Sequence, residues 1–343
     1  MKVIFILGHV MANVLLTQRC VRSCPYCFAK EHMLQPLSES ILGWEDLIYL
    51  ADFIEISGEH HISLLGGEPT LHPDFVNFVL YLLERKISIT VFTSGIMSEP
   101  MLKEMVSSLK SIPNDRLHFI CNLNEPDLSP PGEFERIRHF LEAFGTVTVP
   151  GFNIYHPNFN LEFLFQYINQ YGLDRHIRLG LAHPILGEKN EFLSIQDIKK
   201  VIERLFSYVP LFHRFRIALV LDCGFPMCAF SDEQLGRLYR LTGNNTRFGC
   251  NPAFDIGPDM MTWCCFPLSS YHKKSVFEFD SIREIFDFYQ ERLNNIRIEA
   301  GGIYDDCDYC LHREKNKCAG GCVAHLLSAF RNEERVRLEE IYS

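Results

Sequence analysis

The chain has 343 residues, of which 47% are hydrophobic, so it is long enough to bury a large core and to form two or three domains. Its formal net charge of −10 argues against a nucleic-acid partner, because an extended nucleic-acid surface needs a basic stripe. No apolar run approaches the roughly 18 residues of a membrane span, and the opening MKVIFILGHV lacks a basic region and a cleavage site. The sequence therefore predicts a cytoplasmic protein without a membrane partner.

Cysteine usage points to metal ligands or reactive thiols. The chain contains 13 cysteines, an odd number, and many of them are clustered at short spacings. A disulfide framework is typical of small secreted domains, whereas no signal peptide precedes these cysteines.

Residues 10–222 alternate between short apolar runs and amphipathic stretches. The amphipathic stretches include 75–86 and 195–206, and Ser194 is the expected N-cap of the second. This alternation predicts a parallel sheet with right-handed crossovers. The candidate strands are residues 13–18, 61–66, 88–94, 116–124, 146–155, 177–184 and 215–222.

Three cysteines follow the first candidate strand in the run TQRCVRSCPYCF. Cys20, Cys24 and Cys27 have CxxxCxxC spacing, which supplies three thiolates to an iron-sulfur cubane and leaves one iron open. A zinc loop is the alternative, but structural zinc sites close with four ligands. No fourth cysteine adjoins the run, and the nearest histidine is the lone His32.

A second motif, GGEPT, follows the candidate strand 61–66. Alone, Gly66, Gly67, Glu68 and Pro69 could form a tight strand-to-helix turn. Together with the cysteine run, the motif resembles the radical S-adenosylmethionine (SAM) family. The resemblance implies a [4Fe-4S] cluster whose open iron binds SAM, and reductive cleavage of SAM to a deoxyadenosyl radical that abstracts hydrogen.

The resemblance also implies a fold and a set of SAM-facing residues. Residues 1–222 would form an α/β domain, the partial (β/α)6 TIM-like barrel of the family. Glycines allow close backbone approach to a ligand, while Glu68 offers an anionic acceptor to the SAM ammonium group. Active groups gather at the carboxyl ends of barrel strands. On that basis the further cofactor-binding candidates are Tyr26, Ser94, Asn122, Asn124, Arg136, Arg178 and Leu181.

The region 223–343 holds nine of the 13 cysteines and is expected to end in a helix. The order of its cysteines resembles the SPASM domain, which carries two auxiliary [4Fe-4S] clusters in its family. Carried over, the ligands of the first cluster would be Cys250, Cys264 and Cys322, and those of the second Cys307, Cys310 and Cys318.

The chain departs from the SPASM pattern at the last ligand, because no cysteine follows Cys322. Cys223 or Cys228 could replace that ligand or complete the first cluster; otherwise His325, His312 or an open iron must serve. Two alternatives remain open. One is a zinc site formed by Cys307, Cys310, Cys318 and Cys322, and the other is a single-cluster domain of the twitch type.

Cys265 follows the expected ligand Cys264, at a position where alcohol- and thiol-oxidising SPASM enzymes carry an acidic base. A thiol there weakens the dehydrogenase interpretation, since that reaction needs a general base. We regard Cys265 and Cys223 as candidate catalytic thiols. Cys265 could instead be a buried apolar thiol, as we expect for Cys121.

The resemblance predicts an oxidoreductase or maturase that crosslinks, epimerises or oxidises a ribosomally synthesised peptide, with a flavodoxin or ferredoxin as electron donor. The alternative is a radical SAM enzyme acting on a small molecule such as a sugar or amino acid. An electron-transfer module without SAM is a third possibility, against which the two motifs argue.

Overall fold

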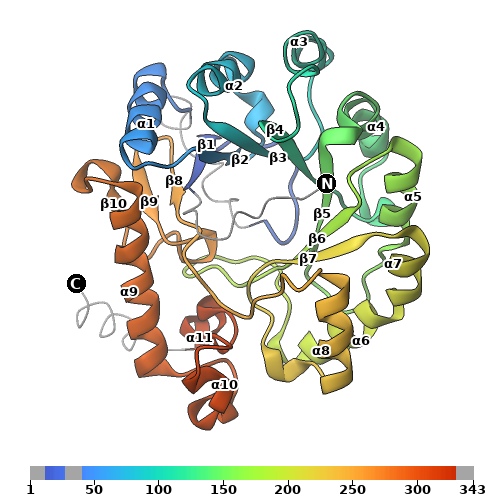
Figure 1. Cartoon of the computed structure of the whole chain (residues 1–343), viewed down its shortest axis with the longest axis vertical. Coiled ribbons are helices and arrows are strands. Elements are labelled where there is room, and N and C mark those ends of the chain that lie inside the picture. The colour runs from blue at the N-terminus through green and yellow to red at the C-terminus, as the bar shows by residue number, and fades with distance from the viewer. Residues whose placement is uncertain (1–11, 28–40, 330–343) are drawn as a thin grey trace.

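The computed structural model describes residues 12–27 and 41–329, and its centre is a sheet of ten strands (Figure 1). Seven of these strands are parallel, stand in chain order, and each is hydrogen-bonded to the next. They are β1 (Ala12–Thr17), β2 (His61–Gly66), β3 (Ser88–Thr93), β4 (Leu117–Asn122), β5 (Thr148–Ile154), β6 (His176–Leu181) and β7 (Ala218–Leu221). The predicted α/β fold with a partial TIM-like barrel is confirmed.

The seven strands overlap the apolar runs of the sequence, and their ends differ from the predicted ones by up to three residues. The run 215–222 was expected to be a strand throughout, but β7 begins only at Ala218. The preceding helix is α7 (Val209–Phe215). It stops there because the next residue, Arg216, has a left-handed φ of 52°. The strand can therefore begin only after this turn.

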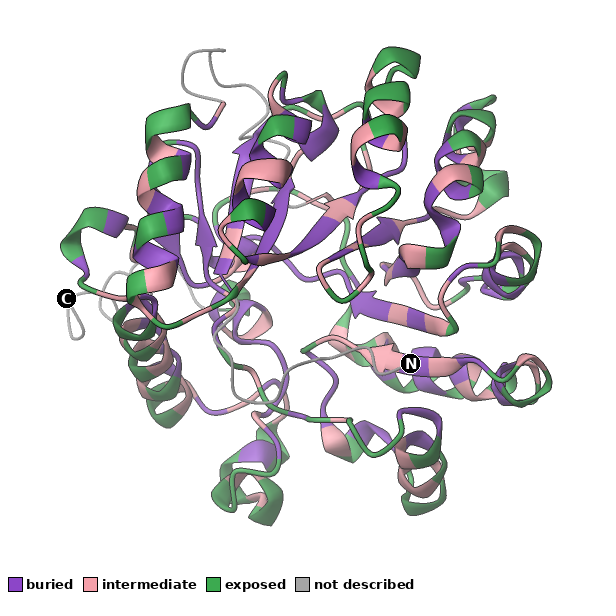
Figure 2. Ribbon diagram, turned by 45° about the horizontal axis from the view of Figure 1, so that its top comes forward, coloured by how far each residue is buried: buried purple, intermediate pink, exposed green. Residues whose placement is uncertain are grey.

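Helices surround the curved sheet on its outer side (Figure 1). Each buries an apolar stripe against the strands and exposes its polar face, as the purple and green faces in Figure 2 show. Ser194 caps the start of the segment 195–206 by accepting from Gln196 N, as predicted. The other helices of this layer are α1 (Trp44–Ile56), α2 (Phe75–Glu84), α3 (Glu99–Leu109), α4 (Glu133–Phe144), α5 (Glu162–Tyr171) and α6 (Ile198–Ser207).

The cysteine-rich region continues the barrel sheet. Strand β8 (Asp255–Ile256) pairs with β1 in parallel, and β9 (Met261–Trp263) and β10 (Lys274–Ser275) follow it in antiparallel order. The predicted boundary between residues 222 and 223 falls just after β7, and as a domain boundary it stays a prediction. The helices of this region are α8 (Asp232–Leu241), α9 (Ile282–Ala300), α10 (Leu311–Glu314) and α11 (Val323–Ala329).

Among the described helices, none is long and apolar enough to cross a membrane. His32 and the residues after Ala329, where a C-terminal helix was expected to continue, lie outside the described residues. Cys121, on β4, is fully buried in the core, as predicted.

Candidate active site

The three cysteines of the first motif lie on the loop that follows β1. This loop turns tightly, since Cys27 N donates to Cys24 O over 3.1 Å and Arg22 N donates to the Cys20 sulfur over 3.4 Å. The Cys20 thiol interacts electrostatically with Cys24, Cys27 and Glu68, so the fold brings the three thiols together beside the second motif.

The environment of these sulfur atoms fits an iron-sulfur cluster. Hydrogen bonds to ligand sulfurs help to set the potential of such clusters. Cys20 receives one from Arg22 N, and Cys24 receives one from Asn124 Nδ2 at 3.8 Å. Burial raises the pKa of Cys20 to about 11, so this thiol must lose its proton when it binds iron.

The GGEP motif packs directly on the cysteine loop. Gly67 N donates to Thr17 O and Glu68 N donates to Arg19 O, over 2.8 and 2.6 Å. A Cβ atom on Gly66 would lie 2.2 Å from Thr17 O, and one on Gly67 would lie 2.1 Å from Arg19 O. Only glycine allows this approach of two backbones, so the two motifs form one unit.

The Glu68 carboxylate is fully buried and organises the ends of the neighbouring strands. Its Oε1 accepts from the hydroxyls of Thr70 and Thr93, at 2.8 and 2.7 Å. Its Oε2 accepts from the backbone N and the hydroxyl of Ser94, at 2.7 and 2.5 Å. Pro69 begins a short 3-10 turn after Glu68. A contact of Glu68 with the SAM ammonium group stays a prediction.

Tyr26 connects the cysteine loop to the fourth and fifth strands. Its hydroxyl donates to Asn124 Oδ1 over 2.6 Å and is hydrogen-bonded to Asn153, while its ring lies 5.0 Å from that of Tyr155. Burial raises the pKa of Tyr26 well above its usual value. Asn153 was missed by the sequence interpretation because no local motif surrounds it.

Polar side chains of adjacent strands face the same interior space. Asn122 pairs in register with Gly151, where a Cβ atom would lie 2.6 Å from the asparagine oxygen. Likewise Asn153 pairs with Gly180, where a Cβ atom would lie 2.7 Å from Asn153 Oδ1. The glycines thus make room for amide side chains at the carboxyl ends of β4 and β5.

Arg178 spans the barrel interior from β6. Its guanidinium lies 2.6 Å from Asp222 Oδ2 and 5.0 Å from the ring centre of Phe92, which belongs to β3 on the opposite side. Burial raises the pKa of Asp222, and Arg178 opposes this shift. Leu181 is buried at the end of the same strand. Asp222, like Asn153, was missed from the sequence.

Within the described part of the chain, Arg136 makes no hydrogen bond or ion pair with these side chains. It is exposed on α4, while the buried residues of that helix include Glu133. Glu133 forms an ion pair of 2.9 Å with Arg22, which also donates to Asn122 O over 2.6 Å. Arg22, on the cysteine loop, therefore reaches the end of β4, where Arg136 had been expected.

The C-terminal cysteines form two sets. Cys250 interacts electrostatically with Cys322 and Cys264. Separately, Cys307 interacts with Cys318 and Cys310. These sets match the two ligand groups that the sequence resemblance implies, and the ligand roles themselves stay predictions.

Cys265 lies beside the first of these sets. Its thiol is hydrogen-bonded to Cys264, and this bond together with burial raises the pKa of Cys265 well above its usual value. Among the described residues, no three His, Cys, Asp or Glu side chains are close enough to hold a single metal ion. A cubane is several atoms wide, so its thiolates stand farther apart than the ligands of one ion.

Sequence comparisons match the N-terminal part of the chain. Residues 14–154 match the model of the radical SAM superfamily. Molybdenum cofactor biosynthesis protein 1 of Bos taurus is 32% identical over 99 residues, 28% of this chain and 16% of that protein. The GTP 3',8-cyclase of Limosilactobacillus fermentum is 27% identical over 124 residues, 35% of this chain and 36% of that enzyme. The chain thus spans well under two thirds of the length of these relatives.

A comparison with solved structures extends over most of the chain. Streptococcus suis SuiB bound to S-adenosylmethionine has a TM-score of 0.64 and 16% identity, covering 93% of this chain and 74% of SuiB. SuiB bound to precursor peptide SuiA matches with the same TM-score and identity. At this identity the likeness shows the fold alone. Residues 14–154 are therefore similar to the radical SAM superfamily of enzymes, and this similarity implies a [4Fe-4S] cluster and SAM as cofactors.

Proposed function

We propose that this radical SAM enzyme modifies a ribosomally synthesised peptide by crosslinking, epimerisation or oxidation. Cys20, Cys24 and Cys27 would hold the cluster, and the GGEP segment would bind the methionine part of SAM. When bound, the cluster supplies the electron that cleaves SAM and so generates the radical that abstracts hydrogen. In this proposal the C-terminal cysteines hold auxiliary clusters, and a flavodoxin or ferredoxin supplies electrons.

The charge balance of the barrel interior carries the proposal. Among the described residues at the strand ends, Arg22 is neutralised by Glu133 at 2.9 Å and Arg178 by Asp222 at 2.6 Å. A nucleoside triphosphate needs cations free to pair with its phosphate groups. A peptide side chain needs none, so neutralised arginines favour a peptide.

An apolar wall beside the cluster loop supports the same substrate class. Leu15, Leu65, Trp263 and Phe266 form a buried group against which Cys27 and Phe92 pack. Trp263 comes from β9, so the cysteine-rich region contributes to the wall of the barrel. Cys27 and Phe92 are only partly buried, and a partly exposed apolar surface of this kind suits the side chain of an amino-acid residue. The fold shared with SuiB, which has been solved with a precursor peptide, adds support.

A small-molecule substrate is the second candidate, and the sequence relatives favour it. Two of them are a molybdenum cofactor biosynthesis protein and a GTP 3',8-cyclase. On this alternative, Arg178 would leave Asp222 to bind a substrate phosphate. The two candidates therefore differ in a measurable way, namely which compound increases SAM cleavage.

The test uses the reconstituted full chain under anaerobic conditions with SAM and a reductant. Short peptides encoded by neighbouring genes are each supplied with deuterium on their side chains, and GTP is supplied in a parallel reaction. We expect the peptide to increase deoxyadenosine formation at least tenfold and to transfer deuterium to it. Stimulation by GTP alone, with an unchanged peptide mass, would overturn the proposal.

A further inference from the structure

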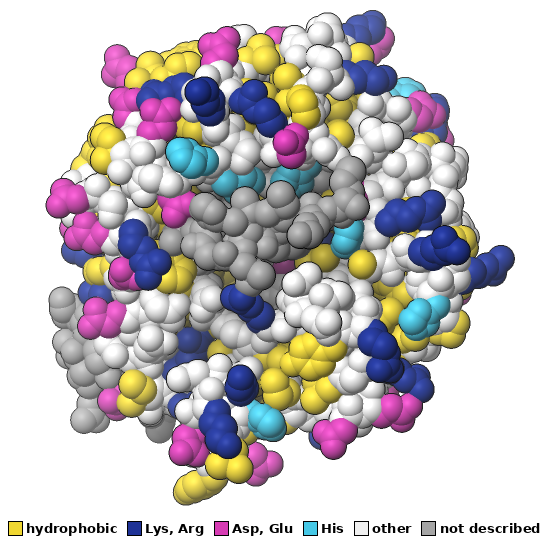
Figure 3. All heavy atoms as spheres, in the orientation of Figure 1, with side chains coloured by type: hydrophobic (Ala, Val, Ile, Leu, Met, Phe, Trp, Pro, Cys, Tyr) yellow, Lys and Arg dark blue, Asp and Glu magenta, His cyan; other side chains and the backbone are white. Residues whose placement is uncertain are grey.

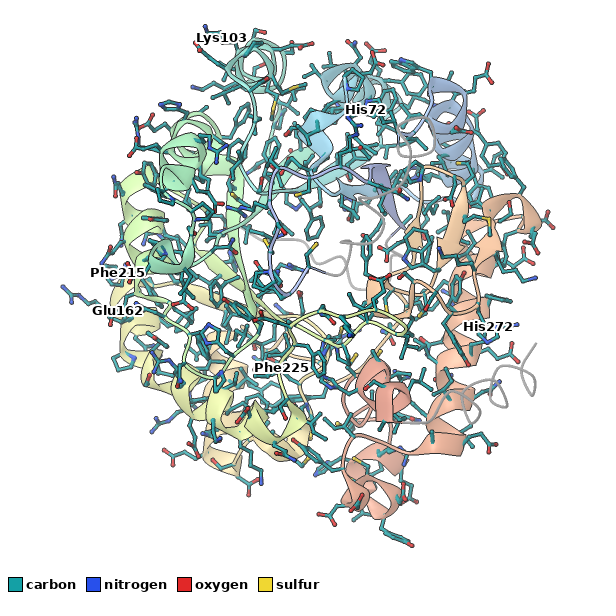
Figure 4. The ribbon with its side chains drawn as sticks, turned by 180° about the vertical axis from the view of Figure 1, so that it is seen from behind. His72, Lys103, Glu162, Phe215, Phe225 and His272 are labelled. Atoms are coloured by element: carbon teal, nitrogen blue, oxygen red, sulfur yellow. The ribbon has the colours of Figure 1, made fainter. Side chains whose placement is uncertain are left out.

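The loop between β7 and α8 carries two thiols, Cys223 and Cys228, that the SPASM resemblance leaves without an assigned ligand role. Both are solvent-accessible. Phe225, between them, is buried, and Figure 4 places it between the helices of the barrel and the C-terminal segment. The loop therefore lies where the two cysteine sets of the C-terminal region meet the barrel.

Cys228 belongs to the second set by position. The backbone N of the preceding residue, Met227, donates to the Cys318 sulfur over 3.4 Å. Phe248 forms a bridge with Cys318 and accepts from Ala319 N over 2.7 Å, which fixes this contact. The Cys228 thiol itself interacts electrostatically with three others, those of Cys307, Cys318 and Cys310.

Cys223 belongs to the first set. Its thiol interacts electrostatically with those of Cys250 and Cys322. Gly224 then turns the chain with a φ of 98°, and a Cβ atom there would lie 2.4 Å from the His183 ring. This tight turn sends the next residues toward the second set, so neighbouring thiols of one loop face different partners.

We propose that this loop supplies one thiolate to each of two auxiliary clusters. Cys228 would thereby replace the ligand that is missing after Cys322, and Cys223 would be a ligand rather than a catalytic thiol. The two complete ligand sets would be Cys223, Cys250, Cys264 and Cys322, and Cys228, Cys307, Cys310 and Cys318. The inference rests on the auxiliary clusters of the proposed function, but not on the identity of the substrate.

Donors around the sulfur atoms agree with this assignment. The Cys318 sulfur accepts from the backbone N of both Met227 and Gly320, each at 3.4 Å. The Cys250 thiol is hydrogen-bonded to Arg297. Such donors stabilise cluster thiolates and help to tune cluster potentials. Four thiolates on each cluster leave no open iron, so these clusters would not bind substrate directly.

The test counts iron and sulfide in a chain that lacks the SAM cluster. A Cys20/Cys24/Cys27 triple alanine variant is the background, so all remaining iron is auxiliary. C307A should remove about four iron atoms, one cubane. Adding C228A to C307A should then leave the iron content unchanged. Adding C228A to C250A should remove the second cubane, or leave a three-iron cluster that is visible by electron paramagnetic resonance. C223A should behave the other way round. Adding it to C250A should leave the iron content unchanged, whereas adding it to C307A should remove the remaining cubane or leave a three-iron cluster.

C121A is the matched control, since Cys121 is a buried thiol on β4 outside both sets. It should leave the iron count unchanged. C228V, which fills the space of the thiol without an atom that can bind iron, replaces C228A if the alanine variant does not fold. An iron content in the C228A/C250A variant equal to that of C250A would overturn the assignment. A loss of iron when C228A is added to C307A would also overturn it. These counts need no substrate, so failure of the peptide proposal would not affect them.

Discussion

A single carboxylate, that of Glu68, holds together the residues that follow β2 and β3. It is fully buried, and its two oxygens accept from Thr70, Thr93 and Ser94. A buried carboxylate is tolerated only when its oxygens are satisfied. Its structural role in the chain is therefore separable from any contact with SAM, since all these donors belong to the protein.

The substitution E68Q should lower the free energy of unfolding by about 1.5–3 kcal/mol even without SAM. The amide nitrogen cannot accept a hydrogen bond, so it leaves Ser94 N or the Thr93 hydroxyl without its acceptor. Denaturant unfolding of the two proteins measures the difference. E104Q, at an exposed position of α3, is the control and should change stability little. Equal stability of E68Q and the unmodified chain would contradict this role.

At the scale of elements, the loop after β1 and the turn after β2 form one unit. Their contact depends on the missing side chain of Gly67, because a Cβ atom there would lie 2.1 Å from Arg19 O and 2.8 Å from Cys20 N. Both atoms are backbone, so neither can move without displacing Cys20.

G67A should lower cluster iron and weaken SAM binding at least tenfold, because the cysteine loop must shift. Iron analysis and equilibrium binding of SAM measure the two effects. G236A is the matched control, since Gly236 lies in α8 and a Cβ atom there meets nothing within 4 Å. That substitution should keep iron and binding and increase helix stability by about 0.5–1 kcal/mol. Normal iron content in G67A would contradict the close-contact argument.

The sequence predicts the elements with long apolar patterns and misses those without them. All seven barrel strands were predicted, because each is a continuous apolar run. Strands β8 and β10 have only two residues each, too few for any periodicity. Asn153 and Asp222 were missed because they reach the interior through the register of adjacent strands. Arg136 was selected by its distance along the chain, but helix geometry exposes it and buries Glu133.

For the whole molecule, the pairing of β1 with β8 is the contact that joins the cysteine-rich region to the barrel sheet. Asp255 lies at this contact, where Asn13 Nδ2 donates to its Oδ1 over 2.9 Å. Burial raises the pKa of Asp255 from 3.8 to about 8. Figure 3 shows that positive and negative side chains are mixed on the surface around the barrel mouth. The contact between β1 and β8 at Asp255 therefore depends on local burial rather than on a large charged patch.

Stability should depend on pH through this group. Folding raises the pKa of Asp255, so its contribution to stability is fully present below about pH 4 and is lost as the pH rises through about 8. D255N cannot ionise, so between pH 5 and 9 the free energy of unfolding should fall by about 4 kcal/mol less in D255N than in the unmodified chain. Denaturant titrations at the two pH values measure this.

D115N is the control for that experiment, because Asp115 is an exposed carboxylate far along the chain from this contact. It should show the same pH dependence as the unmodified chain. If the free energy of unfolding of D255N and of the unmodified chain changed equally with pH, this would contradict a raised pKa of Asp255 in the folded chain.

The parallel pairing of β1 with β8 has a consequence for biosynthesis. Asn13 and Asp255 are 242 positions apart, so β1 gains this neighbour only after β8 has left the ribosome. Contacts between such distant segments slow folding, because a long loop must close first. A nascent chain would therefore expose one edge of β1, close to Cys20, until β8 has been translated.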